Sequence, residues 1–454
     1  MKSDMMEVFS GLGLDVSEAF HYLNIFRNAG PGRFAVIKIS GECTEDSLEQ
    51  ITNDLARVYS SGLIPVVTYG WGGILNRKLM ESGKEVNFNT PNGDRYTDAE
   101  MMGYVLEAAN SAGTALLQSM LSRGIKAQVV PYDKKVIIAS DKKEKGFGEH
   151  NGNVEGINIQ PALDLILKEC VPIITPIGIS NDGEKLYNIN GDTASTELVR
   201  SLDPEKYIML TSTSGVLDNP SSKDGKLISE IVLRRDYESL VRNGILQGGM
   251  KKKIDEAAYS LNSRENGDDR SVQIVSPGNL MAELFTKRGN GTYVRNGYVI
   301  NRQHISRVSK PLVREIIEGA FGENLRDDYF TSPDDDYIRQ AKGIVYSERN
   351  NKGLGIVIPH MFANYLDIVA VGSEYQRNGL GGDIIQAVGP KIFWRSKPGR
   401  DANHLYMKLS DGHVKLTSKD GIDYNGFWKG LDWDGMRNAV FIMQNQPSNF
   451  KQKS

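Results

Sequence analysis

Two lysines and one aspartate stand at separate turns in the first 260 residues, where they could act together on a phosphoryl group. Lys38 lies near the end of the apolar run 34–39, Asp192 enters a helix-length segment, and Lys253 belongs to a Gly-Gly-Met-Lys-Lys-Lys motif. The lysine charges would neutralise phosphate oxygens, and the carboxylate would orient the lysines or a metal ion. These residue types predict phosphoryl transfer if the turns meet on one sheet. A solvent-exposed lysine cluster is the alternative.

Glycine-rich turns follow two apolar runs in the same region. The run 34–39 leads to Ser40-Gly41, and the run 63–67 leads to Gly70-Trp71-Gly72-Gly73. Glycine lets backbone N–H groups approach a phosphate closely, and the N-terminus of a following helix favours the anion. An ordinary tight turn is the alternative, because the chain has no Walker-type GxxxxGK[ST] motif.

A different set of reactive side chains lies beyond residue 360. The apolar run 365–371 leads to an arginine- and glycine-rich turn at the start of a helix, which suits a pyrophosphate. Arg395 and Lys397 are spaced i, i+2, so an extended chain would place both charges on one side, where a dicarboxylate would suit them. The phenol of Tyr406 could return a proton to a departing thiolate. A plain turn between strand and helix and a packed aromatic ring are the alternatives.

Short apolar segments alternate with helix-length segments between residues 31 and 302, which predicts an α/β domain with a mostly parallel sheet. Such a sheet is buried on both faces, which explains strands that are apolar throughout. We expect strands at 34–39, 63–67, 127–130, 171–174 and 206–210, and helices at 45–60, 98–122, 159–168 and 192–202.

The pattern changes near residue 300. Residues 303–312 are polar without a clear period and are predicted to be a linker, so that the second domain covers residues 313–454. In it we expect strands at 343–346, 353–358 and 365–371 and a helix at 380–391. Residues 1–30 are expected to form a helical segment, either a packing helix or an oligomerisation arm.

The composition is that of a soluble folded protein, with 454 residues of which 39% are hydrophobic and 24% charged. The net charge of 54 − 57 = −3 gives no reason to expect nucleic acid. Two cysteines are too few for a disulfide framework or a structural zinc site. The chain has no apolar run long enough for a membrane span and no secretory or mitochondrial signal, so we expect a cytoplasmic protein.

From Phe34 to Arg302 the order and spacing of the motifs resemble the amino-acid kinase family, most closely the acetylglutamate kinases. The resemblance implies transfer of the ATP γ-phosphoryl group to the side-chain carboxylate of N-acetylglutamate, with Mg²⁺ entering with ATP. It implies that Lys38 and Lys253 neutralise the transferring group while Asp192 organises the two lysines. The substrate-binding residues that it implies are Gly72, Gly73, Arg95, Asn188 and Asn190.

Glu283 and Gly289 are similar to the arginine-binding signature of feedback-inhibited members of that family. The resemblance implies L-arginine as an effector, and a helix C-cap is the alternative.

Residues 365–382 resemble the acetyl-CoA pyrophosphate loop of the GNAT acetyltransferase superfamily, whose fold is α+β. The implied acetyl-CoA-binding residues are Val369, Val371, Gln376, Arg377, Asn378, Gly379, Leu380, Gly381 and Gly382. Residues 393–431 are similar to the acetyltransferase domain of N-acetylglutamate synthases of the vertebrate-like and bifunctional type. There the matching tyrosine is the general acid, so Tyr406 is expected to be catalytic. The acceptor site is expected to contain Arg395, Lys397, Arg400 and Asn403.

Both halves together resemble the bifunctional N-acetylglutamate synthase/kinase family over nearly the whole chain. This implies acetyl transfer from acetyl-CoA to the α-amine of L-glutamate, in arginine biosynthesis, by a homo-oligomer of four or more chains. The sequence departs from the family pattern at several positions, among them Tyr69, where histidine is usual, and Arg400, where asparagine is usual. The open alternatives are a kinase-like half that is only a regulatory scaffold, a paralogue that acetylates another amino acid, and a non-catalytic arginine sensor that binds a partner.

Overall fold

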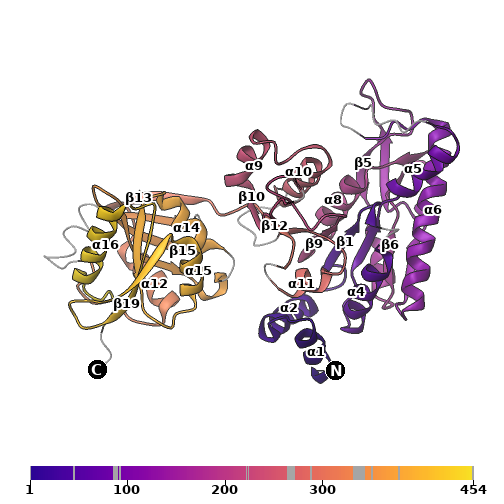
Figure 1. The fold of residues 1–454 in the computed structure, drawn as a ribbon. Helices are drawn as coiled ribbons and strands as arrows, with labels where there is room; N and C mark the ends of the chain where they lie inside the picture. The colour runs from indigo at the N-terminus through magenta and orange to yellow at the C-terminus, as the bar shows by residue number, and fades with distance from the viewer. Residues whose placement is uncertain are drawn as a thin grey trace. The chain divides into compact units, whose positions relative to one another are not determined.

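The structure is a computed structural model that describes residues 2–43, 47–84, 90, 94–220, 222, 224–262, 271–286, 289–330, 343–348, 351–376 and 379–451. The chain divides into two compact units, Met1–Asn296 and Gly297–Ser454 (Figure 1). In the described ranges, no helix has the length and apolar character needed to cross a membrane.

The first unit is built on an eight-stranded sheet in the order β10-β12-β11-β9-β1-β2-β6-β3. Neighbouring strands run parallel except for β11 and β12, which are antiparallel. This pairing confirms the predicted mostly parallel sheet. As expected for such a sheet, the central strands β1, β2, β6 and β9 are buried along their whole length. The strands are β1 (Ala35–Ile39), β2 (Val66–Tyr69), β3 (Ala127–Val130), β6 (Val171–Ile174), β9 (Lys206–Leu210), β10 (Glu230–Val232), β11 (Val272–Val275) and β12 (Thr292–Arg295).

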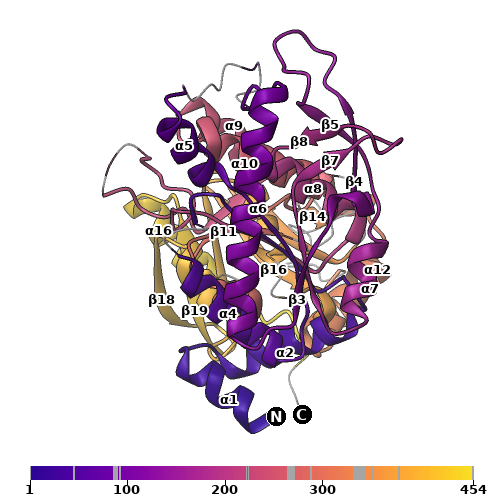
Figure 2. The same cartoon turned by 90° about the vertical axis from the view of Figure 1, so that its right-hand side faces the viewer.

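Helices cover both faces of this sheet, because alternate side chains of each strand enter opposite cores. On β1, Ile37 packs with one group of helices and Val36 with the other. The first group is α1 (Lys2–Gly11), α2 (Val16–Asn28), α4 (Leu48–Ser60), α5 (Gly72–Glu81), α6 (Ala99–Ser122) and α11 (Leu280–Phe285). The second is α7 (Gln160–Ile166), α8 (Gly191–Leu202), α9 (Leu233–Arg242) and α10 (Gly248–Asn262). Figure 2 shows the long helix α6 lying across the sheet.

The N-terminal helices pack on the body of the first unit. Phe9 of α1 and Phe26 of α2 contact Phe285 of α11, with ring centroids 4.9 and 5.9 Å apart. This arrangement fits the packing-helix interpretation of residues 1–30.

A second, four-stranded sheet in the first unit was not predicted. Its order is β5-β4-β7-β8, formed by β4 (Ile137–Asp141), β5 (Gly152–Ile157), β7 (Ile177–Ile179) and β8 (Leu186–Asn188). These strands are short, and β4 and β5 carry exposed polar residues, so they lack the long apolar runs that identify the main sheet.

Tyr69, the residue that departs from the family's histidine, is a core residue. It is 1% exposed, and its hydroxyl donates to the carbonyl of Ala109 at 3.0 Å and contacts Thr175 Oγ1 at 3.0 Å. A Cβ atom added to Gly113 of α6 would lie 2.3 Å from this hydroxyl. The ring therefore occupies space that only glycine leaves open.

Replacing Gly113 tests this packing. Gly113→Ala should lower the free energy of unfolding of the first unit by about 1–3 kcal/mol, because overpacking outweighs the gain of about 1 kcal/mol in helix propensity. The measurement is urea unfolding of the full chain, with hydrogen exchange resolving the first unit.

Gly103→Ala in the same helix is the matched control, since no atom lies within 4 Å of the added Cβ. It should stabilise by about 0.5–1 kcal/mol. The double variant Gly113→Ala with Tyr69→Phe should lose less free energy of unfolding than the sum of the losses in the two single variants. Strictly additive losses would contradict the contact.

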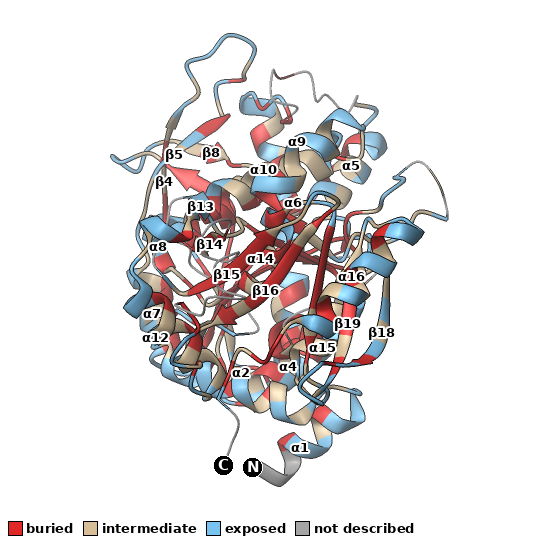
Figure 3. Ribbon diagram, turned by 90° about the vertical axis from the view of Figure 1, so that its left-hand side faces the viewer, coloured by how far each residue is buried: buried red, intermediate tan, exposed pale blue. Residues whose placement is uncertain are grey.

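The second unit is built on a seven-stranded sheet in the order β13-β14-β15-β16-β17-β19-β18. Its pairings are antiparallel except for β16 with β17. The expected α+β fold is confirmed, and Figure 3 shows β15 and β16 buried at its centre. The strands are β13 (Ile300–His304), β14 (Ile344–Glu348), β15 (Gly353–Pro359), β16 (Asn364–Val371), β17 (Ile392–Ser396), β18 (Gly412–Thr417) and β19 (Asp423–Lys429), and the helices are α12 (Lys310–Phe321), α14 (Leu380–Val388), α15 (Ala402–Leu409) and α16 (Trp433–Asn445).

The predicted boundary near residue 302 and the predicted linker need correction. Strand β13 pairs antiparallel with β14, so residues 300–304 belong to the second unit. The range 303–312 contains the end of that strand, the 3₁₀ turn η2 (Ile305–Arg307) and the start of α12, whose N-cap is Ser309. The edge strand has an exposed polar middle, which removes the alternation by which a strand is recognised.

Candidate functional sites

The two lysines and the aspartate that were predicted to act together lie side by side in the first unit. Lys38 comes from β1, Asp192 from the first turn of α8 and Lys253 from the first turns of α10. The Lys38 Nζ atom lies 2.6 Å from Asp192 Oδ1, and the Lys253 Nζ atom lies 3.8 Å from Asp192 Oδ2. One carboxylate thus holds both ammonium groups.

Burial shapes the charges of this trio. Burial lowers the pKa of Lys38, while the charge of Asp192 opposes that shift. Burial alone would raise the pKa of Asp192, but the charges of Lys38 and Lys253 outweigh it and the pKa is lowered. The carboxyl is therefore ionised at neutral pH, and an ionised trio carries a net charge of about +1 that can face an anion. Ser40 contributes its hydroxyl, which lies 3.0 Å from Lys38 Nζ.

The two glycine turns lie back to back next to the trio. A Cβ on Gly41 would lie 2.4 Å from the backbone nitrogen of Gly72, and one on Gly70 would lie 2.7 Å from the nitrogen of Gly41. Gly72 is exposed at the start of α5, with no atom within 4 Å of an added Cβ, so its backbone can be approached closely. Gly73 follows it in α5. Trp71, between the turns, is buried in the core and leaves this approach open.

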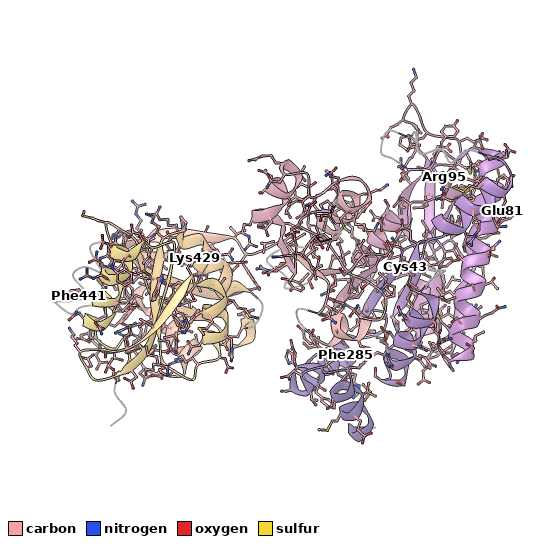
Figure 4. The ribbon with its side chains drawn as sticks, in the orientation of Figure 1. Cys43, Glu81, Arg95, Phe285, Lys429 and Phe441 are labelled. Atoms are coloured by element: carbon pink, nitrogen blue, oxygen red, sulfur yellow. The ribbon has the colours of Figure 1, made fainter. Side chains whose placement is uncertain are left out.

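The predicted substrate-side residues line the neighbouring loops. Arg95 is buried and donates through Nη2 to Asn76 of α5; Figure 4 places Arg95 near that helix. Burial lowers the pKa of Arg95 to about 10. Asn190 caps α8, accepting from the backbone nitrogen of Asp192 at 3.0 Å. Asn188 ends β8 and donates to Thr97 Oγ1 at 3.0 Å.

Asp94 is a buried carboxylate that the sequence reasoning missed. It accepts from Asn190 Nδ2 at 2.9 Å and forms ion pairs with Lys142, at 3.0 Å, and with Lys252. Burial alone would raise its pKa, but the two lysines lower it. Asp94 therefore ties the loop of Arg95 to the helix that carries the phosphoryl-site lysine. Its place beside Arg95 was the available signal, but nothing in the sequence indicated two distant lysines as partners.

Asp94→Asn should destabilise the first unit by about 2–4 kcal/mol, because two partly buried ammonium groups lose their carboxylate. Urea unfolding of the full chain at pH 7 is the measurement. Asp141→Asn is the matched control: its carboxylate also pairs with a lysine, Lys185 at 2.6 Å, but its side chain is 53% exposed. That change should cost at most about 1 kcal/mol.

The pH dependence of the Asp94→Asn effect has a definite sign. Because the folded pKa of Asp94 is lowered, its contribution is fully present above the ordinary carboxyl pKa of about 4 and is lost as the pH falls through the folded pKa. The stability difference between the two proteins should shrink below pH 4. A difference that grows on acidification would contradict the assignment.

Glu283, at the predicted effector signature, is 1% exposed at α11. Its Oε1 accepts from the backbone nitrogens of Asn290 and Gly291 at 2.6 and 2.7 Å. A Cβ on Gly289, whose φ is +48°, would lie 2.2 Å from the carboxylate, so only glycine fits there. Burial raises the pKa of Glu283.

A buried lysine faces the same region. Lys206 of β9 is 5% exposed, and burial lowers its pKa to about 8 while the charge of Glu283 opposes the shift. Its Nζ atom lies 4.6 Å from the ring centroid of Tyr22 in α2. The Oε2 atom of Glu283 is buried and accepts no hydrogen bond within the described part of the chain. The two charges and the aromatic ring suit a zwitterionic ligand with a cationic group.

In the second unit, strands β16 and β17 part where acetyl-CoA was expected. They pair only from Asn364–Leu366 to Ile392–Trp394, while β16 continues to Val371. Val369 and Val371 therefore belong to the part of β16 that β17 does not pair. Both residues are among those that the resemblance to GNAT acetyltransferases predicts to bind acetyl-CoA.

The predicted pyrophosphate turn joins β16 to α14. Gly379 precedes the helix with φ +86°, and Leu380 is buried in the core. Added Cβ atoms at Gly381 and Gly382 meet only ordinary contacts or open space. Gln376 donates to the carbonyl of Val371 at 3.1 Å. The remaining two predicted residues, Arg377 and Asn378, lie outside the described residues.

Tyr406 lies at the point where the two strands part. Its ring, half-buried on α15, packs edge-on against Trp394 and Phe427, with centroids 5.8 and 5.6 Å away. Trp394 is the last residue of β17 that pairs with β16. Burial raises the pKa of Tyr406 to about 12, and the charge of Arg400 opposes this shift. The phenol is therefore protonated at neutral pH and available as a donor.

The structure does not bring Arg395 and Lys397 together as the sequence spacing predicts. Arg395 donates through Nη1 to the carbonyls of Met443 and Gln446 at 2.7 and 2.8 Å, and it stacks on Tyr424 at 4.2 Å. It therefore fixes the C-terminal end of α16 and is not the partner of Lys397. The i, i+2 spacing assumed a continuous strand, but β17 ends at Ser396.

The cation that accompanies Lys397 is Arg400. Both pair with Glu323, which follows α12: Lys397 Nζ lies 3.0 Å from Oε2, and Arg400 binds Oε1. Asn403 donates from Nδ2 to the carbonyl of Lys397 at 3.0 Å and so shapes this loop. Glu323 was not predicted, because it lies more than 70 residues before its two partners.

Comparison with known proteins assigns the first unit. The model of the Amino acid kinase family matches residues 33–276, more than half of the chain. The chain belongs to this family. An acetylglutamate kinase of Xylella fastidiosa (strain 9a5c) is 32% identical over 419 residues, covering 91% of this chain and 94% of that protein, so the similarity extends through both units.

Solved structures share the fold of both units. The N-acetylglutamate synthase of Neisseria gonorrhoeae complexed with coenzyme A and N-acetyl-glutamate is 18% identical, with a TM-score of 0.62, covering 91% of this chain and 98% of that chain. The same synthase complexed with coenzyme A and L-arginine is 17% identical, with a TM-score of 0.56 and the same coverage.

Proposed function

We propose that the second unit transfers the acetyl group of acetyl-CoA to the α-amine of L-glutamate. The observation that carries this proposal is the phenol of Tyr406 at the point where β16 and β17 part, beside a loop with two cations. The synthase from Neisseria gonorrhoeae, with the same fold, was solved with coenzyme A and N-acetyl-glutamate. An acceptor with carboxylates suits Lys397 and Arg400.

The proposed reaction needs no covalent enzyme intermediate. The neutral amine attacks the thioester carbonyl, and the carbon–sulfur bond breaks as the amide forms. Backbone N–H groups near Val369 and Val371 would stabilise the oxyanion. The Tyr406 proton goes to the departing sulfur, and the proton lost by the amine returns to solvent or restores the phenol.

Tyr406→Phe should lower kcat for thiol release from acetyl-CoA by about 10²-fold, the usual contribution of a general acid. The dissociation constant of acetyl-CoA should change little. Because the pKa of Tyr406 is raised to about 12, the phenol stays protonated in assays up to about pH 10, and the ratio of wild-type to variant kcat should be constant from pH 7 to 10.

Tyr346→Phe is the matched control, because Tyr346 belongs to the same hydrophobic cluster but has no proposed role. It should leave kcat within about twofold. An unchanged kcat in Tyr406→Phe would remove the phenol from its acid role.

We further propose that the first unit is an active acetylglutamate kinase, which phosphorylates the side-chain carboxylate of N-acetylglutamate with ATP and its Mg²⁺. The support is that buried Lys38 and Asp192 form one group with half-buried Lys253, beside an approachable glycine turn. Relatives that match over both units carry the name acetylglutamate kinase. A kinase-like half that serves only as a regulatory scaffold would not require both lysines on Asp192.

Lys253→Ala should abolish phosphorylation of N-acetylglutamate, with a loss of at least about 10³-fold, because one of two charges that stabilise the transferring group is removed. Acetyl transfer, measured in the same preparation, should be retained. Lys251→Ala is the matched control, since Lys251 pairs with Asp255 at the surface. Equal loss of both activities would indicate structural damage instead of a catalytic role.

L-Arginine is the proposed effector of the first unit, because Glu283 and Lys206 offer a buried carboxylate and a buried ammonium in one region. The synthase with the same fold was also solved with L-arginine. Assembly into a homo-oligomer of four or more chains and a cytoplasmic location stay predictions.

A further inference from the structure

Two aromatic rings support the cations of the acceptor loop. Phe321, the last residue of α12, and Phe450 lie with ring centroids 5.0 Å apart. The guanidinium of Arg400 lies 4.7 Å from the Phe321 centroid, and Lys397 Nζ lies 5.8 Å from that of Phe450. The two cations are therefore held over one apolar surface.

Glu323 already forms ion pairs with both cations. Each of its carboxylate oxygens faces one of them, Oε2 facing Lys397 and Oε1 facing Arg400. The helix end fixes its place: Gly322 ends α12 with φ +62°, and its backbone nitrogen donates to the carbonyl of Glu318. The side chain of Glu323 is 22% exposed, so it is near the surface of the unit and within reach of a ligand.

This group adjoins the proposed general acid. The loop that carries Lys397 and Arg400 leads directly into α15, and the backbone nitrogen of Asn403 in the first turn of that helix donates to the carbonyl of Arg400 at 3.0 Å. Tyr406 lies on this helix, six residues after Arg400. In the proposed acetyl transfer, a carboxylate bound by these cations belongs to the acceptor, whose amine attacks the thioester.

We infer that Glu323 competes with the carboxylate of the acceptor for Lys397 and Arg400, and that it is a specificity-determining residue of the acceptor site. This inference rests on the proposed acetyl transfer. With Glu323 in place the group offers a net charge of +1, whereas L-glutamate with a neutral amine brings two carboxylates. Removal of the Glu323 charge should favour an acceptor with two carboxylates more than one with a single carboxylate.

The test replaces Glu323 by its neutral isostere. Glu323→Gln should lower the KM for L-glutamate about fivefold, the size expected for removing one partly exposed charge close to others, with kcat within about twofold. The inhibition constant of N-acetyl-L-glutamate should fall by a similar factor, and that of N-acetyl-L-glutamine by less than about twofold. The KM for acetyl-CoA should not change. A role limited to structure would not separate the two inhibitors.

Glu315→Gln is the matched control, because Glu315 is an exposed residue of the same helix. It should leave all of these constants within about twofold. An unchanged or higher KM for L-glutamate in Glu323→Gln, or an equal effect on both inhibitors, would overturn the inference. A wild-type protein that releases no thiol with any amino acid would instead overturn the proposed acetyl transfer, so the two failures are distinguishable.

Discussion

One carboxylate held between two cations is the interaction on which the candidate sites depend. Asp192 lies between Lys38 and Lys253. Asp94 pairs in the same way with two lysines, and Glu323 pairs with one lysine and one arginine. Two like charges would repel each other in a partly buried site, and a buried charge without a partner is costly. The shared carboxylate removes both problems while it leaves one positive charge for an anionic ligand.

The two sheets bring such groups together by different means. In the first unit, the parallel strands and the helices bring residues from distant parts of the chain into contact, as with Lys38 of β1 and Asp192 of α8. In the second unit, β16 and β17 pair over only three residues and then separate. Beyond Leu366, β17 no longer pairs with β16, and the aromatic rings of Trp394 and Phe427 support the phenol beside the point of separation.

The sequence predicted the features that depend on local patterns. Fully buried strands such as β1 and β9 stand out as apolar runs, and glycine turns mark the positions where backbones touch, as at Gly41 and Gly70. The polar edge strand β13 was not predicted, and its end falls in the predicted linker, because an exposed strand has no apolar period. Sequence spacing groups Arg395 with Lys397 because it does not show that a helix end lies within reach of Arg395.

Long-range partners explain the rest of what sequence reasoning missed. Asp94 and Glu323 are ordinary acidic residues in the sequence, and only the fold shows that each one binds two distant cations. In both cases a residue beside a predicted binding residue changes what that residue can do: Asp94 fixes the loop of Arg95, and Glu323 occupies Lys397 and Arg400. The charge that a site presents to its ligand is therefore a property of the assembled group. A motif read along the chain counts the cations but not the carboxylate that already neutralises one of them.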